Sequence, residues 1–225
     1  MSVQITCLIP AHNEAPRLAR VLEVVRDHPG VARVIVVDDG SSDGTAEVAA
    51  RCGVEVMRLS PNGGKSAAIA AGLAAVRTPH VLLLDADLTG LRAADLTALI
   101  APVLAGQSEV ALSLRGNAPG LWRVIGVDYI TGERVLPMAL VAPCLAQIAA
   151  LPRFGLEVFL NGRIKAAGLR VSIVRWPGVA SPAKARKRGR WAGLRADAAM
   201  IRDILRTVGL RVILGQILYL RAGEG

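Results

Sequence analysis

The stretch HVLLLDADLTG, residues 80–90, decides the fold, because an apolar run that could form a buried strand leads directly into two aspartates. Asp85 and Asp87 are two residues apart, and strand side chains at that spacing point the same way. If the strand opens into a turn here, both carboxylates converge, which is costly unless a cation lies between them. Mg²⁺ or Mn²⁺ meets that need. The alternative is a strand-end aspartate that caps the next turn, and the pair alone leaves both interpretations open.

Two other apolar runs also end in polar residues: QITCLI (4–9) precedes PAHNE, and RVIVVD (33–38) leads into DDGSSDGT. Further strands are expected at 54–59, 81–85 and 109–114, separated by helices at 15–27, 43–53, within 62–76, and at 93–106 with Pro102 as a point of kinking. This rhythm predicts an α/β fold with a parallel sheet covered by helices on both faces. Ligands bind beyond the carboxyl ends of such strands, so the three polar segments are expected to form one site.

The second half of the chain is less regular. Residues 116–134 are expected to form a loop with little regular structure. Helices are predicted at 138–151 and 156–168, followed by a strand at 169–176 and an amphipathic helix from about 190 to 219.

The charge of the chain favours an anionic partner, because its formal net charge is +9 at pH 7. A nucleic acid, a phosphorylated small molecule and a membrane surface all fit that charge. The segment KARKRGR (184–190) holds five of the basic residues, and no aromatic RNA-binding pattern or zinc-finger spacing is present, so nucleic acid is not expected.

Cys7, Cys52 and Cys144 are far apart and form no CxxC, which is typical of a reduced, cytosolic chain.

Membrane association is expected to be peripheral. The chain opens as a strand without a basic region and cleavage site, so no signal peptide is expected, and no apolar run reads as a good spanning helix. The basic segment has three interpretations: it clamps a diphosphate, docks on an acidic membrane, or is a solvated loop. Together with the C-terminal amphipathic helix, it predicts contact through residues 184–221 with the inner face of the membrane.

Two further segments carry candidate ligands for a nucleotide. Asp39, and Asp38 as second choice, follow a strand and could accept hydrogen bonds from a ribose hydroxyl or a base; the alternative is a loop with a helix cap at Ser42 or Asp43. In NGGKSAA (62–68), backbone N–H groups and Lys65 could hold phosphate at a helix N-terminus. The spacing of a P-loop is absent, and a solvated lysine is the alternative.

Taken together, IPAHNE, VIVVDDGSSDGT, NGGKSAAIAAG and LLLDADL resemble the inverting family 2 glycosyltransferases of GT-A fold, over about residues 3–115. The resemblance implies a Rossmann-like, mostly parallel sheet and a nucleoside-diphosphate sugar donor, a UDP- or GDP-sugar. It assigns Asp85 and Asp87 to ribose, diphosphate and metal, with Asp87 as the direct ligand. It places the following residues near the nucleotide: Pro10, Ala11, Asn13, Glu14, Asp39 and Lys65.

The second half resembles bacterial relatives of the polyprenyl-phosphate sugar synthases, through TGERVLP and RFGLEVFL. The resemblance implies that Gly132 and Arg134 line the diphosphate or acceptor side, and that a polyprenyl phosphate is the acceptor. Glu157 is the candidate for acceptor positioning or general base, and its alternative is a first-turn glutamate that stabilises a helix. Related chains often carry a histidine near the metal where this chain has Ser181 and Pro182.

The resulting hypothesis is one domain, residues 1–225, with a nucleotide-sugar half (1–115), an acceptor half (116–190) and a C-terminal helical segment (191–225). It would transfer a sugar with inversion, with a metal on Asp87 stabilising the departing diphosphate. A hydroxyl acceptor would need a base such as Glu157 or Asp128, whereas a phosphate acceptor would need none. The alternatives are a nucleotidyltransferase, whose glycine- and arginine-rich loop is missing, and a non-catalytic relative that binds nucleotide or lipid.

Overall fold

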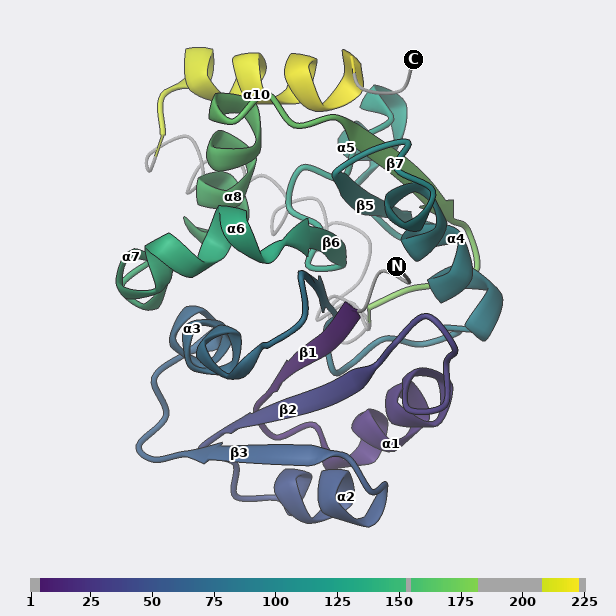
Figure 1. Cartoon of the computed structure of the whole chain (residues 1–225), viewed down its shortest axis with the longest axis vertical. Coiled ribbons are helices and arrows are strands. Elements are labelled where there is room, and N and C mark those ends of the chain that lie inside the picture. The colour runs from purple at the N-terminus through teal and green to yellow at the C-terminus, as the bar shows by residue number, and fades with distance from the viewer. Residues whose placement is uncertain (1–4, 153–154, 182–207, 223–225) are drawn as a thin grey trace.

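The computed structural model describes residues 5–152, 155–181 and 208–222, and its centre is one seven-stranded sheet (Figure 1). The strand order is β3-β2-β1-β4-β6-β5-β7. Every neighbouring pair is parallel except the two that involve β6, which runs antiparallel to both β4 and β5. The mostly parallel sheet expected from the sequence is confirmed.

The first half alternates strand and helix as predicted. Its strands are β1 (Ile5–Ala11), β2 (Arg33–Asp39), β3 (Glu55–Leu59), β4 (His80–Leu83) and β5 (Val110–Arg115). Its helices are α1 (Ala15–Val25), α2 (Thr45–Arg51), α3 (Lys65–Ala75) and α4 (Ala93–Leu104), the last with Pro102 inside it. In α1 the apolar residues at helical spacing, Leu18, Val21, Leu22 and Val25, are the buried ones. Local periodicity therefore located these elements to within a few residues.

The predicted loop at 116–134 is wrong in part, because it contains helix α5 (Gly120–Ile125) and runs into strand β6 (Arg134–Pro137). β6 is four residues long and lies between β4 and β5. If the alternation of strand and helix simply continued, β4 and β5 would be neighbours in the sheet. Such a short strand carries no readable periodicity, so the sequence did not predict it.

The helix predicted at 138–151 is also wrong, since it is three short pieces: α6 (Met138–Val141), a 3₁₀ turn η1 (Ala142–Cys144) and α7 (Leu145–Ala149). Pro143 lies in the turn, where its missing N–H and its ring prevent a continuous helix. Helix α8 (Gly155–Ala166) and strand β7 (Val171–Trp176) follow as expected.

The C-terminal helix α10 (Leu210–Ala222) begins after Gly209, so residues 208–209 of the predicted helix 190–219 are not helical. The part of that prediction before residue 208 and the whole basic segment 184–190 lie outside the described residues. No helix among residues 5–152, 155–181 and 208–222 is long and apolar enough to cross a membrane.

Both faces of the sheet are covered, as predicted. Figure 1 shows α3, α7 and α8 on one side of the sheet and α1, α2 and α4 on the other. Each side has its own apolar core, the first around Leu8, Ile35 and Ile69, the second around Ile9, Leu22 and Leu99. Because β1, β2 and β4 are parallel neighbours, their carboxyl ends meet at one edge of the sheet.

Candidate functional site

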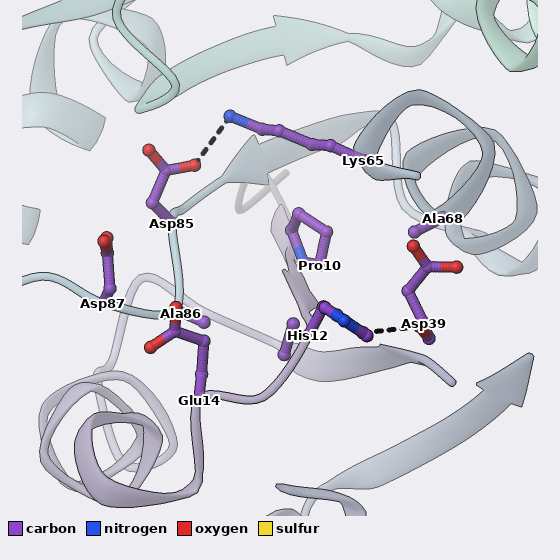
Figure 2. Close-up of a pocket in the computed structure, with 10 residues that line it drawn as sticks. Pro10, His12, Glu14, Asp39, Lys65, Ala68, Asp85, Ala86 and Asp87 are labelled. Atoms are coloured by element: carbon purple, nitrogen blue, oxygen red, sulfur yellow. Dashed lines mark hydrogen bonds and ion pairs between the residues drawn. The ribbon is translucent and has the colours of Figure 1, made fainter. Parts of the chain in front are cut away.

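A cavity of about 270 Å³ opens at this edge, beyond the carboxyl ends of β1, β2 and β4 (Figure 2). Four acids and one lysine share it with small apolar residues. The lining residues are Pro10, Ala11, His12, Glu14, Asp39, Lys65, Ala68, Asp85, Ala86 and Asp87. The prediction that the three polar segments form one site is therefore confirmed, and seven of the residues predicted for that site line the cavity.

The β1 end contributes Glu14 and also His12, whose role the sequence did not predict. His12 Nδ1 lies 2.9 Å from the Asp39 carbonyl oxygen, so the ring is tied to the end of β2. Asn13 turns away, with a φ of 55° and a side-chain oxygen that accepts a hydrogen bond from the Ser42 N–H at 2.9 Å. Asn13 shapes the loop and is not among the lining residues.

The β2 end contributes Asp39, which is buried and holds the glycine turn before α3. Its two carboxylate oxygens accept hydrogen bonds from the N–H groups of Gly63 and Gly64, both at 2.8 Å. Asp38 is buried beside it, accepts a hydrogen bond from the Ser41 N–H at 3.3 Å, and does not line the cavity.

The predicted cap of α2 at Ser42 or Asp43 is wrong, because Gly44 occupies the N-cap position in a left-handed conformation. Asp43 instead accepts a hydrogen bond from the Thr45 N–H at 3.1 Å.

Lys65 joins the two halves of the chain. Its ammonium lies 2.8 Å from Asp85 Oδ1 and 3.3 Å from Glu157 Oε1, at the start of α8 (Figure 2 shows the first pair). Burial raises the pKa of Asp85, but Lys65, Arg115 and Arg134 together lower it by more, so the net shift is downward. Burial lowers the pKa of Lys65, and Asp85 and Glu157 raise it by more. Lys65 is therefore paired with a carboxylate from each half of the chain while its side chain stays 42% exposed, so the solvated-lysine alternative fits its exposure but does not account for its two ion pairs.

Asp87 has no cationic partner within 4.0 Å among the described residues. Burial, Asp85 and Glu14 together raise its pKa to about 6. β4 ends at Leu83, so the chain has turned by the time it reaches this pair and both carboxylates line the cavity. Their crowding is the condition under which a divalent cation binds favourably.

The donor set fits Mg²⁺ or Mn²⁺ bound jointly by protein and phosphate. No group of three or more His, Cys, Asp and Glu side chains that could hold a metal lies in the part of the chain that the structure describes. Asp87 and Asp85 would therefore provide few ligands, and ligand phosphates the others. Ser181 is no obvious third ligand, because its hydroxyl accepts a hydrogen bond from Arg115 and its carbonyl one from Asn117. Pro182 lies outside the described residues.

Two residues predicted for the site are buried behind it. Arg134 is 1% exposed and donates its hydrogen bonds to the Thr131 carbonyl and to Asn161. Asp128 is also 1% exposed and pairs with Arg115 at 3.2 Å. Neither lines the cavity, so neither is placed to touch a substrate.

A second cavity of about 520 Å³ adjoins the first, and the two share Lys65. It lies between the start of α3 and the start of α8, and its lining residues are Gly63, Gly64, Lys65, Ser66, Leu151, Leu156 and Glu157. The Glu157 side chain is 8% exposed and pairs with Lys65. The first turn of α3 provides backbone N–H groups there without a side-chain cap.

Gly132 is a sensitive point, because a Cβ atom on it would lie 2.6 and 2.7 Å from the two Asp85 carboxylate oxygens. We expect Gly132→Ala to lower the free energy of unfolding by about 1–3 kcal/mol, since Asp85 or the turn must move. Urea denaturation measures this. Gly120→Ala is the control, because nothing lies within 4 Å of its added Cβ and alanine favours a helix. Equal stability of the two variants would contradict the close packing of Gly132 on Asp85.

Comparisons with known proteins give a family match and a fold match. The family model for glycosyl transferase family 2 matches residues 6–131, more than half of the 225-residue chain. The glycosyltransferase AglJ of Haloferax volcanii is 39% identical over 103 residues, which cover 46% of this chain and 33% of that protein. The dolichyl-phosphate beta-glucosyltransferase ALG5A of Trichomonas vaginalis is 35% identical over 100 residues, which cover 38% of this chain and 31% of that protein. Each match thus spans about a third of the relative's own length.

Among solved structures, glucosyl-3-phosphoglycerate synthase from Mycobacterium tuberculosis, in complex with Mn²⁺ and uridine-diphosphate-glucose, has a TM-score of 0.70. The match is 22% identical in sequence and covers 92% of this chain and 79% of that one. This likeness confirms the expected GT-A type of α/β fold.

Proposed function

The chain belongs to glycosyl transferase family 2, and on that premise we propose that it transfers a sugar from a nucleoside-diphosphate sugar to a phosphate-bearing acceptor. The observation that carries the proposal is the cavity of Figure 2, where Asp39, Lys65, Asp85 and Asp87 meet beyond three parallel strands. Four acids against one lysine would repel a diphosphate. A divalent cation on Asp87 and Asp85 reverses that repulsion, which makes donor binding dependent on metal.

Different residues of the cavity would bind different parts of the donor. Asp39, held by two backbone N–H groups, has lone pairs left for a ribose hydroxyl or a base N–H. Asp87 and Asp85 would hold Mg²⁺ or Mn²⁺, which stabilises the charge on the departing diphosphate. Lys65 provides a second cation at the same edge. Inversion needs no protein nucleophile, because the acceptor attacks the anomeric carbon directly. The solved relative was crystallised with Mn²⁺ and UDP-glucose, which supports this assignment.

A phosphate-bearing acceptor is supported by the names of two similar proteins. One is a dolichyl-phosphate glucosyltransferase and the other a glucosyl-3-phosphoglycerate synthase. For this chain we propose a lipid phosphate such as polyprenyl phosphate, reached at the membrane surface. The exposed side chains Leu210, Leu214 and Leu218 form one ridge of α10, and Arg211 and Arg221 flank it, as in helices that lie in an anionic interface. The basic segment would add to this contact.

Thermal unfolding with nucleoside diphosphates tests the proposal. UDP, GDP, CDP and dTDP are each added with and without Mn²⁺. A ligand at a hundred times its dissociation constant adds about 2.7 kcal/mol of stability. We expect one diphosphate to stabilise the protein, and only with Mn²⁺ present. If none does, catalysis on a nucleotide sugar is wrong, and the non-catalytic lipid-binding alternative, which the family membership does not favour, gains support.

Glu157→Gln distinguishes the two kinds of acceptor. A hydroxyl acceptor needs a base, and losing one costs about 10²–10⁴-fold in turnover. A phosphate acceptor is already anionic, so we expect a loss of less than about tenfold, due to the weakened contact with Lys65. Initial rates of sugar transfer with a total lipid extract as the source of acceptor measure this, because such an extract contains both phosphate and hydroxyl acceptors. A loss of a hundredfold or more, with unfolding unchanged, would contradict the phosphate acceptor and identify Glu157 as the base.

A further inference from the structure

Arg134 is a buried cation that makes no ion pair within 4.0 Å among the described residues. It is 1% exposed, at the first position of β6. Burying a guanidinium is costly, and such groups usually face a carboxylate. Here Nε and Nη2 both donate to one backbone carbonyl, that of Thr131, and Nη1 donates to Asn161 Oδ1 at 3.2 Å. The planar fork of the arginine is therefore used to hold backbone in place.

The backbone that it holds is the turn Thr131–Glu133, which lies directly behind Asp85. Gly132, in the middle of this turn, is so close to Asp85 that an added Cβ would lie 2.6 Å from Oδ1. The Thr131 hydroxyl is 2.6 Å from Glu133 Oε2 and 2.7 Å from the Ser113 hydroxyl, so the side chains of the turn are fixed as well. The place of the turn therefore determines where the Asp85 carboxylate can lie.

The arginine is itself anchored to two helices. Asn161, on α8, accepts from Arg134 and donates to the Tyr129 carbonyl at 2.8 Å. The Tyr129 hydroxyl donates to Gln216 Oε1, on α10, at 2.6 Å. All of these side chains are buried. A satisfied buried network of this kind fixes geometry more than it adds stability.

We propose that Arg134 is a positioning residue: by holding the Thr131 carbonyl it seats Gly132 against Asp85 and so sets the Asp85 carboxylate between Lys65 and the metal position. It acts through the turn and does not touch substrate. The consequence for the metal rests on the proposed function, whereas the consequence for the Asp85 carboxylate does not.

Arg134→Lys tests the proposal, because it keeps the positive charge but loses the planar guanidinium that donates two hydrogen bonds to the Thr131 carbonyl. Arg33→Lys is the matched control: Arg33 also donates to a backbone carbonyl, that of Ala75, but at the opposite end of the strands. Crystal structures of the wild type and of both variants give the position of the Asp85 carboxylate relative to Lys65. We expect Arg134→Lys to break the 2.8 Å contact between Asp85 Oδ1 and the Lys65 ammonium as the turn shifts, and Arg33→Lys to leave that contact unchanged.

Mn²⁺ binding in the presence of the stabilising nucleoside diphosphate, followed by electron paramagnetic resonance, is the second readout. We expect about a tenfold weaker affinity in Arg134→Lys and a change of less than twofold in Arg33→Lys. In an Asp85→Asn background, the effect of Arg134→Lys should disappear, because its target is gone. An unchanged position of the Asp85 carboxylate, or an equal loss of affinity in the Asp85→Asn background, would overturn the proposal.

Two further outcomes are also decisive. If Arg134→Lys does not fold, Asn161→Ala removes one anchor of the guanidinium and should move the Asp85 carboxylate in the same direction by a smaller amount; no movement would overturn the proposal. If the wild-type protein binds no metal with any nucleotide, the proposed function fails, and the position of the Asp85 carboxylate alone decides the role of Arg134.

Discussion

Replacing Asp87 with asparagine is expected to abolish metal-dependent nucleotide binding and, at the same time, to stabilise the metal-free protein. Asparagine has the same shape without the charge. Turnover should fall by about 10³-fold or more, because the metal would lose its direct ligand. The departing diphosphate would then lose the positive charge that stabilises it. Stability should rise, because Asp87 is crowded by burial and by the carboxylates of Asp85 and Glu14. Binding and unfolding measured on one preparation test both effects.

The gain in stability should depend on pH in a defined way. The pKa of Asp87 in the folded protein is about 6, against 3.8 for the ordinary side chain. Between these values the unfolded chain has released its proton and the folded protein has not, so stability falls as pH rises through this window. Above about pH 6 the penalty is fully present, and we expect Asp87→Asn to add about 2 kcal/mol there. Below about pH 4 the gain should vanish.

Asp128 titrates in the same window, because burial raises its pKa to about 6 as well. The wild-type pH profile therefore contains both groups, and only the difference between wild type and Asp87→Asn isolates Asp87. Asp27→Asn is the control for charge removal, since that carboxylate is 78% exposed. An equal gain at pH 4 and pH 8 would show that crowding of Asp87 is not the cause.

The sequence predicted which residues gather at the edge of the sheet, for a physical reason. In a parallel sheet, the residue that follows each buried strand arrives at the same edge, so Asp39, Asp85 and Asp87 could be brought together from local patterns alone. The glycine turn before Lys65 could also be predicted, because it directly precedes a helix. The contacts of each side chain could not be predicted, because Asn13 and Asp38 lie near the ends of the same strands but do not line the cavity.

The remaining features depend on contacts between distant parts of the chain. Lys65 and Glu157 are 92 residues apart and meet because the starts of α3 and α8 line the same second cavity. Arg134 is part of a strand too short to show periodicity, and its insertion between β4 and β5 turns a residue predicted to face substrate into a buried one. His12 could have been suspected from its place between Pro10 and Glu14, but only its bond to the end of β2 puts it in the cavity.

Lys65→Met is expected to destabilise the protein. It leaves Asp85 and Glu157, with side-chain exposures of 24% and 8%, without their shared cation. Removing one partner of a buried ion pair costs about 3–5 kcal/mol. Because the Lys65 side chain is 42% exposed and partly screened by water, we expect a loss of about 1–3 kcal/mol. Urea denaturation at pH 8 measures it.

Two responses distinguish this cause from a general packing defect. Without Lys65, the pKa of Asp85 should rise, so protonation of Asp85 removes the penalty and the loss should shrink between pH 8 and pH 5. Mn²⁺ with the preferred nucleoside diphosphate should also recover part of the loss, because the metal brings positive charge to Asp85. Lys165→Met, which removes an exposed lysine from the last turn of α8, should show neither response. A loss that is constant with pH and insensitive to metal would mean that Lys65 stabilises the protein through its methylene groups and not through its charge.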